Sequence, residues 1–450
     1  MKTLNIIYVL ILVAGFTSCK KFLDVKPEES VSDAQTIFDR ASSETALRGV
    51  YSSLASEGYY GSSFQMIGYL SGDNIQWTGS QSQIQEFINH NVKSENSTIN
   101  GAWTSIYRTI NRINQVLDKV PLVEDAALTT AIKDRIIGEA YALRALAYFD
   151  LVRVWGGVPL ILTPTNTPTE NVGLARSTAE ETWTQVLADL DQAESLLAET
   201  TSRFTVTKKT VYALKARYYL YRNDPIKAEE YADKIIGDAS SYSLVKPFRA
   251  FFATENNQVI RGSAESVFEI FYNGTTETNG HGTSWLAQTS GGTRQWAPND
   301  AFVALVNDPL VGGNRNVTIA KDNQNRWYGN FYRTVNAAPS YVIRTAEVYL
   351  IRAEARTAQD KLVPALQDLN AVRDRAGLAP VVASAKSDVQ HAIENERRIE
   401  FAFEPHRWFD LVRTGRANTV LSISDNNRLL LPIPAQQRLL DDGLAQNPGY

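Results

Sequence analysis

The segment ENERRIEFAFEPHRWFDLVR, which begins at residue 394, holds the densest group of ionisable residues in the chain. Glu396, Glu400 and Glu404 recur every four residues, so on a helix they share one face. Two carboxylates about 5–9.5 Å apart across a sugar are what glycoside hydrolysis requires. Three arginines lie alongside them: Arg397, Arg398 and Arg407. Because guanidinium groups lower carboxylate pKa values and a general acid needs a raised one, we expect a structural Arg–Glu network here, with hydrolysis as the alternative.

The sequence offers little support for nucleophilic catalysis, nucleotide binding or a metal site. His406 and Asp410 have the residue types of a base and its orienting acid, but no G-x-S-x-G nucleophile motif appears in the chain. The H-E-x-x-H zinc motif, the P-loop and the Rossmann glycine pattern are absent as well. A single cysteine cannot complete a thiolate zinc site, and Asp73, whose carboxylate suits calcium, lies in no loop that resembles an EF-hand. We therefore predict no catalytic residue, no cofactor and no metal.

Half of the eight tryptophans lie among Gly, Ser, Thr, Asn and Gln, where no local pattern predicts burial of a large apolar ring: Trp77, Trp285, Trp296 and Trp327. Sugars present apolar C–H faces that stack on such rings, and their hydroxyls need amides, carboxylates and guanidiniums at the rim of the site. Four residues are candidates for the rim: Asp73, Asn74, Arg294 and Tyr328. We predict that at least two of these tryptophans face a carbohydrate or polar peptide; anchoring of a loop is the alternative for each.

Amphipathic helices must position these residues. The stretch GAWTSIYRTINRINQVLDKV, from residue 101, places apolar side chains at spacings of three and four. The stretch AIKDRIIGEAYALRALAYFDLVRVW continues the same period until GGVPL stops it. The remaining tryptophans fall in or beside helical patterns, and we expect them in the core: Trp103, Trp155, Trp183 and Trp408.

Two later stretches share one design of helix, short break and second helix. They are TKKTVYALKARYYLYRNDPIKAEEYADKIIG from Thr207 and RTAEVYLIRAEARTAQDKLVPALQDLNAVRDRAG from Arg344. Alanines fall where the paired helices must approach each other, and the unit is about as long as a 34-residue tetratricopeptide repeat. We expect repeat-like packing, and a generic helical hairpin is the alternative.

Residues 248–333 interrupt the helical series. Their composition is rich in Gly, Asn and Thr, which predicts an irregular, loop-rich insert with a few short strands.

Cys19 is the only cysteine in the chain, and it follows an apolar run at residues 4–16. That run has the roughly 7–15 residue length of a signal h-region and is shorter than the roughly 20 residues that span a bilayer. The pattern resembles a bacterial lipoprotein signal, which predicts a signal peptide at residues 1–18, lipidation of Cys19 and a tether at residues 19–30. Ordinary cleavage, or a buried or reactive thiol, is the alternative.

The composition is that of a globular protein, with 44% hydrophobic and 21% charged residues among 450. A formal net charge of −4 gives no overall basic field, so nucleic acid is an unexpected partner.

Several segments together resemble the SusD/RagB family of outer-membrane nutrient-binding lipoproteins from Bacteroidetes. They are CKKFLDVKPEES, WTSIYRTINRINQVL, GEAYALRALAYFDLVRVWGGVPL, YLIRAEARTAQD, ALQDLNAVRDRAGL, ERRIEFAFEPHRWFDLVRTGR and the closing LLPIP and QNPGY. The resemblance implies a mainly α fold with tetratricopeptide-like units and a TonB-dependent SusC-like barrel as partner. It also implies that the protein binds a glycan or, as in the RagB branch, a peptide, and is not an enzyme. The family's aromatic ligand platform lies partly in the segment that corresponds to SGDNIQWTG and partly in the insert.

The resulting hypothesis is a lipoprotein of the cell outer membrane, exposed at the surface, that captures an oligosaccharide and delivers it to the transporter. Its expected organisation is an N-terminal helical region at residues 31–245 and a C-terminal region at 246–450, the latter with the insert and a helical repeat at 341–415. Peptide binding with the same partner, a lipid-anchored glycoside hydrolase and a scaffold for other envelope proteins are the alternatives.

Overall fold

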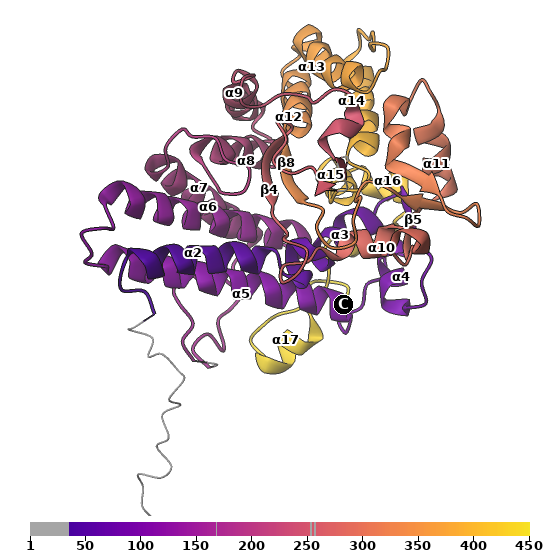
Figure 1. Ribbon diagram of the computed structural model, residues 1–450. Coiled ribbons are helices and arrows are strands. Elements are labelled where there is room, and N and C mark those ends of the chain that lie inside the picture. Colours follow the sequence, from indigo (N-terminus) through magenta and orange to yellow (C-terminus); the bar gives the residue numbers. More distant parts are fainter. Residues whose placement is uncertain (1–35, 168, 253, 256–257) are drawn as a thin grey trace, which may run out of the picture.

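The structure is a computed structural model that describes residues 36–450 except 168, 253 and 256–257 (Figure 1). The expected signal peptide, Cys19 and the tether lie outside the described residues. Helices dominate the described part, so the mainly α fold class is confirmed. No helix in residues 36–450, gaps excepted, is long and apolar enough to cross a membrane.

Four long helices form the N-terminal part of the structure, at the lower left of Figure 1: α2 (Arg40–Leu54), α5 (Ser97–Lys119), α6 (Thr130–Trp155) and α7 (Ala179–Leu196). α6 packs between α5 and α7. It is buried along most of its length and ends at Gly156, whose φ of 74° suits glycine, as the GGVPL stop predicts. α5 buries the predicted apolar stripe that includes Trp103, Ile106 and Ile110.

Two helical hairpins follow, and both match the predicted pairs: α8 (Lys208–Tyr221) with α9 (Pro225–Ile236), and α12 (Thr345–Ala358) with α13 (Leu362–Arg375). The alanines at the close approaches are fully or almost fully buried, as expected. α9 and α12 also pack together, which stacks one hairpin on the other. The tetratricopeptide-like character of these units stays a prediction.

The C-terminal helices complete the scaffold: α14 (Lys386–Glu400), α15 (Arg407–Arg413), α16 (Ala417–Leu421) and α17 (Ala435–Leu440). Near the N-terminal helices lie a π-turn at Glu57–Gly61, α3 (Ser63–Leu70) and α4 (Ser82–Ile88). The segment 248–333 contains α10 (Gly280–Trp285), α11 (Asp300–Asn307) and 3₁₀ turns at Phe248–Phe251, Gln288–Ser290 and Gly313–Thr318. Further 3₁₀ turns lie at Val120–Leu122 and Asn426–Leu429.

The strands are short and form antiparallel pairs. β1 (Ile75–Trp77) pairs with β5 (Trp296–Pro298), and β4 (Ser266–Ile270) pairs with β8 (Ser340–Arg344). β2 (Thr254–Glu255) pairs with β3 (Gln258–Val259), and β6 (Ile319–Lys321) pairs with β7 (Trp327–Gly329). The β1–β5 pair joins the segment around residue 75 to the insert, and β5 also lies next to β7.

One large core runs through the helices and the insert. Trp103, Trp155 and Trp408 are buried in or beside it, as predicted. Trp183 is half-buried and packs edge-on against Phe149, with 5.2 Å between the ring centroids.

Candidate functional site

The carboxylates of α14 and the residues after it form a buried ion cluster. Glu396, Glu400 and Glu404 are each at most 3% exposed. Glu400 accepts hydrogen bonds from Arg315 Nε at 2.7 Å and Arg344 Nη1 at 3.0 Å, and it also pairs with Arg375. The predicted structural Arg–Glu network is therefore confirmed. Its arginines come from distant parts of the chain, however, and not from the neighbouring positions 397, 398 and 407.

The two central carboxylates of this cluster differ in their pKa. Burial raises the pKa of Glu400, but Arg375, Arg315 and Arg344 outweigh that effect and lower the pKa to about 2. Burial raises the pKa of Glu404 above its ordinary value, and Arg344 does not compensate it fully. Arg344 lowers the pKa of Glu404 as expected of a guanidinium neighbour, but burial and the charges of Glu400 and Glu347 outweigh it. Neither side chain has the exposed surface that a sugar needs in order to reach it.

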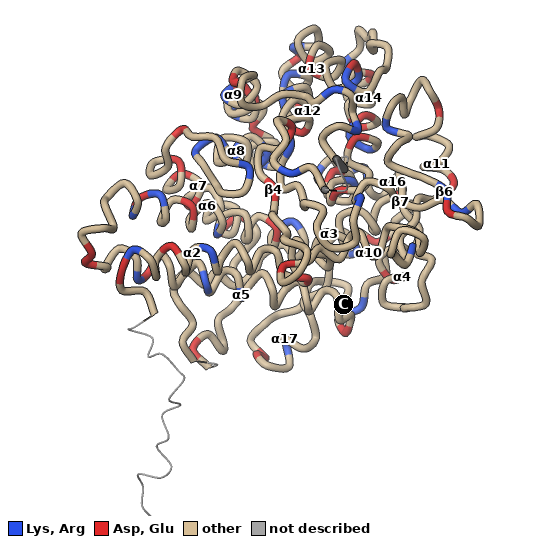
Figure 2. The backbone as a smooth tube through the Cα atoms, in the orientation of Figure 1, with Lys and Arg blue, Asp and Glu red and all other residues tan. Residues whose placement is uncertain are grey.

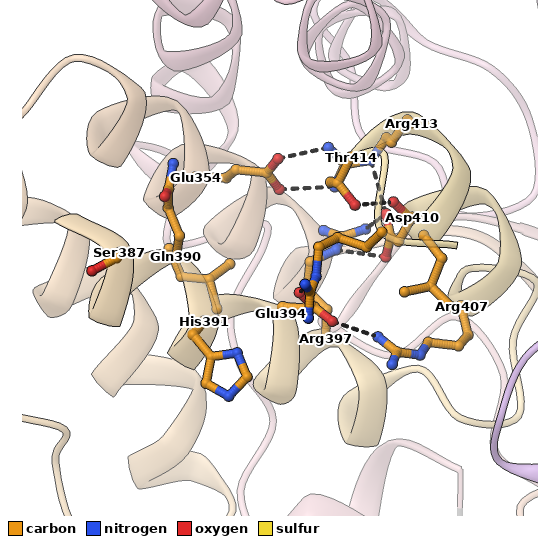
Figure 3. Close-up of a pocket in the computed structure, with 13 residues that line it drawn as sticks. Glu354, Ser387, Gln390, His391, Glu394, Arg397, Arg407, Asp410, Arg413 and Thr414 are labelled. Carbon is orange, nitrogen blue, oxygen red and sulfur yellow. Dashed lines mark hydrogen bonds and ion pairs between the residues drawn. The ribbon is translucent and has the colours of Figure 1, made fainter. Parts of the chain in front are cut away.

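A polar pocket of about 370 Å³ lies between α12, α14 and α15 (Figure 3). Its acids are all paired: Glu354 with Arg413 at 2.6 Å, Asp410 with Arg397 at 2.8 Å, and Glu394 with Arg416 at 3.1 Å. Burial raises the pKa of Asp410, but Arg397 and Arg413 outweigh it and hold the pKa below its ordinary range. Asp410 therefore stays ionised and is not suited to act as a general acid.

His406 and Asp410 do not form the base and orienting acid that their residue types suggest. His406 Nε2 lies 3.7 Å from Glu347, whereas Asp410 accepts hydrogen bonds from Arg397 and Arg413. Burial lowers the pKa of His406 to about 3, so the ring is neutral at physiological pH.

Two of the predicted rim residues form ion pairs or hydrogen bonds with arginines of the protein itself. Asp73 pairs with Arg407 at 2.6 Å and with Arg398 at 3.1 Å. Asn74 is 1% exposed and accepts a hydrogen bond from Arg398 Nε at 2.8 Å. The expectation that Asn74 lies at a ligand rim is wrong for this reason, since its amide is buried in the contact that joins β1 to α14. Asp73 stays a prediction, with most of its hydrogen-bonding capacity already used.

Trp285 and Trp296 lie in the interior, with exposed fractions of 0% and 3%. Their rings meet edge to face at a centroid distance of 5.7 Å. Glycine permits this packing: a Cβ at Gly329 would lie 2.5 Å from the Trp285 ring. The expectation that these two rings face a ligand is therefore wrong, because the Gly-rich texture around them reflects close packing and not exposure.

The other four predicted residues come together at one edge of the insert, which we call the aromatic edge: Trp77, Arg294, Trp327 and Tyr328. All four are half-buried. Strand β5 lies between β1, which ends at Trp77, and β7, which holds Trp327 and Tyr328. In Figure 1 this region lies at the right, with β5 beside α10 and α11.

Arg294 connects the two tryptophan segments. Its backbone carbonyl accepts a hydrogen bond from the Thr78 hydroxyl, and its Nε donates to the carbonyl of Trp327 at 2.7 Å. Its φ of 52° lies in the left-handed region that disfavours a side chain. Strained positions of this kind persist where the surroundings impose them, and they cluster at ligand sites.

The Trp77 ring lies over the backbone of Gly79. A Cβ at that glycine would lie 2.2 Å from Cζ2 of the ring, so only glycine leaves the ring in this position. One side of Trp77 packs on the core and the remainder is exposed.

Lys321 belongs to the same site but was not predicted. It is the cross-strand partner of Trp327 in the β6–β7 hairpin, and its Nζ lies 4.8 Å from the centroid of the Trp327 ring. The turn-forming sequence DNQN between the two strands was the available signal, because a hairpin at that turn places Lys321 opposite Trp327.

Comparison with known proteins defines the family. Residues 21–220 match the model of a family described as starch-binding and associating with the outer membrane, and residues 314–450 match the model of the SusD family. The chain belongs to the SusD family.

Relatives of this SusD-family protein match it over all or part of its length. A SusD-like protein of Formosa agariphila is 26% identical over 518 residues, which cover 100% of this chain and 99% of the relative. The starch-binding protein SusD of Bacteroides thetaiotaomicron is 24% identical over 62% of this chain and 52% of its own. A solved laminarin-binding SusD-like protein has the same fold, with a TM-score of 0.80, 24% identity and coverage of 92% of this chain and 100% of its own.

No group of three or more His, Cys, Asp or Glu side chains in the described residues is arranged to hold a metal ion. At the aromatic edge, half-buried aromatic rings lie next to the guanidinium of Arg294, and these residue types suit a small polar ligand.

Proposed function

We propose that this SusD-family protein binds an oligosaccharide at the aromatic edge and delivers it to a TonB-dependent SusC-like transporter in the outer membrane. The observation that carries the proposal is the half-exposure of Trp77 and Trp327 on either side of Arg294. A sugar ring stacked on an indole buries its C–H face, and the terminal guanidinium nitrogens of Arg294 have no hydrogen-bond partner among the described residues.

Binding without hydrolysis fits the state of the carboxylates. Glu400 and Glu404 lie in a buried ion cluster, and the acids of the polar pocket are all paired. The descriptions of the family model and of two relatives, as starch-binding or laminarin-binding, support a glycan as the ligand. Peptide binding with the same partner is the alternative.

The proposal also includes an anchor. Lipidation of Cys19 would hold the protein at the outer membrane, and each buried methylene of an acyl chain contributes about 0.8 kcal/mol. The tether at residues 19–30 then joins the anchor to the helical scaffold.

Retention in a gel that contains polysaccharide tests the binding function. We expect slower migration of the purified protein with at least one glycan, and normal migration for Trp77→Ala combined with Trp327→Ala. Trp285→Phe is the control, because its ring lies in the core. Retention by peptides and by no glycan would refute the oligosaccharide assignment.

Co-purification tests the partner. A tagged chain expressed with the SusC-like barrel of its own organism should bring that barrel through a column in mild detergent. A barrel that never co-elutes would remove the partner from the proposal.

A further inference from the structure

The cations of the aromatic edge have no carboxylate partners. Neither Lys321 nor Arg294 forms an ion pair within the described residues, although Lys321 contacts the ring of Trp327 and Arg294 contacts its backbone carbonyl. In the polar pocket, by contrast, each of the arginines 397, 407, 413 and 416 is paired with an acid. A chain whose formal net charge is −4 has enough acids to pair these two cations, so their isolation is a local property.

The acid on the same hairpin, Asp322, offsets the positive charge of Arg294 only in part. Asp322 follows β6, and its carboxylate is occupied by Arg326, which donates from Nε at 2.9 Å and from its backbone N–H at the same distance. The side chain of Asp322 is 2% exposed, whereas that of Arg326 is 45% exposed. The exposed side chains of Lys321 and Arg326 therefore lie around a buried carboxylate. Figure 2 places the hairpin at the right edge of the molecule, with acidic and basic positions next to each other.

Like charges meet at this edge. Burial lowers the pKa of Arg294 and the charge of Arg326 lowers it further, while the charge of Asp322 offsets part of this effect. An anion bound beside Arg294 would offset the repulsion from Arg326 and accept hydrogen bonds from the terminal guanidinium nitrogens of Arg294.

We propose that the ligand of the aromatic edge is an acidic oligosaccharide, one that carries uronate carboxylates or sulfate esters, and that Lys321 and Arg294 bind its anionic group beside the Trp327 ring. This inference rests on the proposed glycan-binding function and names the class of glycan. The Trp327 ring stacks on a sugar face. Lys321, which lies over that ring, and Arg294, which contacts the Trp327 carbonyl, then bind the anionic group of the sugar. A neutral glucan uses the rings but leaves both cations without a partner.

The test is calorimetric titration of the purified protein with four probes. Oligogalacturonate carries carboxylates, oligosaccharides of κ-carrageenan carry sulfates, laminarin oligosaccharides are neutral, and polyaspartate is an acidic peptide. We expect binding of at least one acidic glycan, weakened when NaCl rises from about 50 to about 500 mM because the Debye length falls. The carboxylated and the sulfated probe distinguish the two sources of charge.

Variants of Lys321 locate the contact. Lys321→Gln should weaken binding of the acidic glycan about fivefold and reduce its salt dependence, as expected for loss of one rim charge. Lys321→Arg, which keeps the charge, should retain the affinity. Lys234→Gln is the matched control, because Lys234 also lies over an aromatic ring, 4.2 Å from the centroid of Tyr231, but belongs to α9.

Each other outcome has a distinct meaning. Binding of laminarin alone, without salt dependence, overturns the acidic ligand and leaves the glycan-binding function intact. Polyaspartate bound more tightly than either acidic glycan replaces the glycan by a peptide. Absence of binding to all three glycans contradicts both proposals. Equal affinity of Lys321→Gln and Lys234→Gln for an acidic glycan refutes the assignment of the charge to the aromatic edge.

Discussion

Replacement of Glu400 by glutamine removes the charge at the centre of the buried ion cluster. The carboxylate is fully buried and pairs with Arg315, Arg344 and Arg375, all of which are at most 1% exposed. Glutamine keeps the volume and one acceptor oxygen but leaves three guanidinium groups with less negative charge between them. We expect Glu400→Gln to fold with a large loss of stability.

Two estimates give a similar magnitude. Removal of one partner from a buried ion pair costs about 3–5 kcal/mol, because the remaining charge stays desolvated. The pKa of Glu400 falls from 4.5 to about 2 on folding, which corresponds to about 3 kcal/mol at neutral pH. They describe the same interaction and are not added. The expected loss is therefore about 3–5 kcal/mol.

Urea unfolding at pH 7, followed by circular dichroism, measures this loss. The control is Glu230→Gln, which makes the same chemical change in an exposed pair with Lys234 and should cost less than about 1 kcal/mol. A loss below about 1 kcal/mol for Glu400→Gln would refute the view that the buried ion cluster stabilises the fold. Products formed from a glycan by wild-type protein, and abolished in a folded Glu400→Gln variant, would instead favour hydrolysis.

The pH dependence of the difference has a definite sign. The folded pKa of Glu400 is depressed, so its contribution is present in full above about pH 4.5 and is lost as the pH falls toward 2. The stability difference between wild type and Glu400→Gln should thus shrink to about half or less at pH 3. A difference that stays constant from pH 7 to pH 3 would show that the carboxylate is not ionised in the folded state.

Three further predictions concern single residues. Trp285→Ala should lower the free energy of unfolding, measured in urea, by about 3–5 kcal/mol because it empties a core site. Trp77→Ala should lower it by half of that or less, and equal losses would contradict the placement of the two rings. Gly79→Ala should displace the Trp77 ring and weaken glycan binding roughly threefold to tenfold with little change in melting temperature, and unchanged affinity would exclude that ring from the site. Cys19→Ala should lose palmitate labelling and leave the membrane fraction, and a variant that still labels would show that Cys19 is not the lipidation site.

The helical scaffold was predictable because its signals are local. The three- and four-residue spacing in α5, the GGVPL stop after α6 and the alanines of the two hairpins are each contained within a few turns of chain. Local periodicity is set by the geometry of the helix itself, so one sequence is enough to read it.

The sequence predicts that an Arg–Glu network forms, but it does not predict which arginines belong to it. Arg315, Arg344 and Arg375 approach Glu400 from separate elements, and sequence neighbours such as Arg397 pair with other acids. The raised pKa of Glu404 depends on burial, which spacing does not reveal.

The candidate site was predictable in part. Polar, Gly-rich surroundings indicated exposure for Trp285 and Trp296, yet both rings are buried, since glycines such as Gly329 allow backbone and ring to touch. Trp77 and Trp327 have similar surroundings but lie at strand ends near the surface. The distinction depends on which strands pair, and that is a long-range property.

A crystal structure of the protein with a bound oligosaccharide tests the central claim most directly. We predict that a sugar ring stacks on Trp77 or Trp327, with an anionic substituent within hydrogen-bond distance of Lys321 or Arg294. Sugar density in the polar pocket between α12, α14 and α15, with both tryptophans free of contacts, would contradict the account.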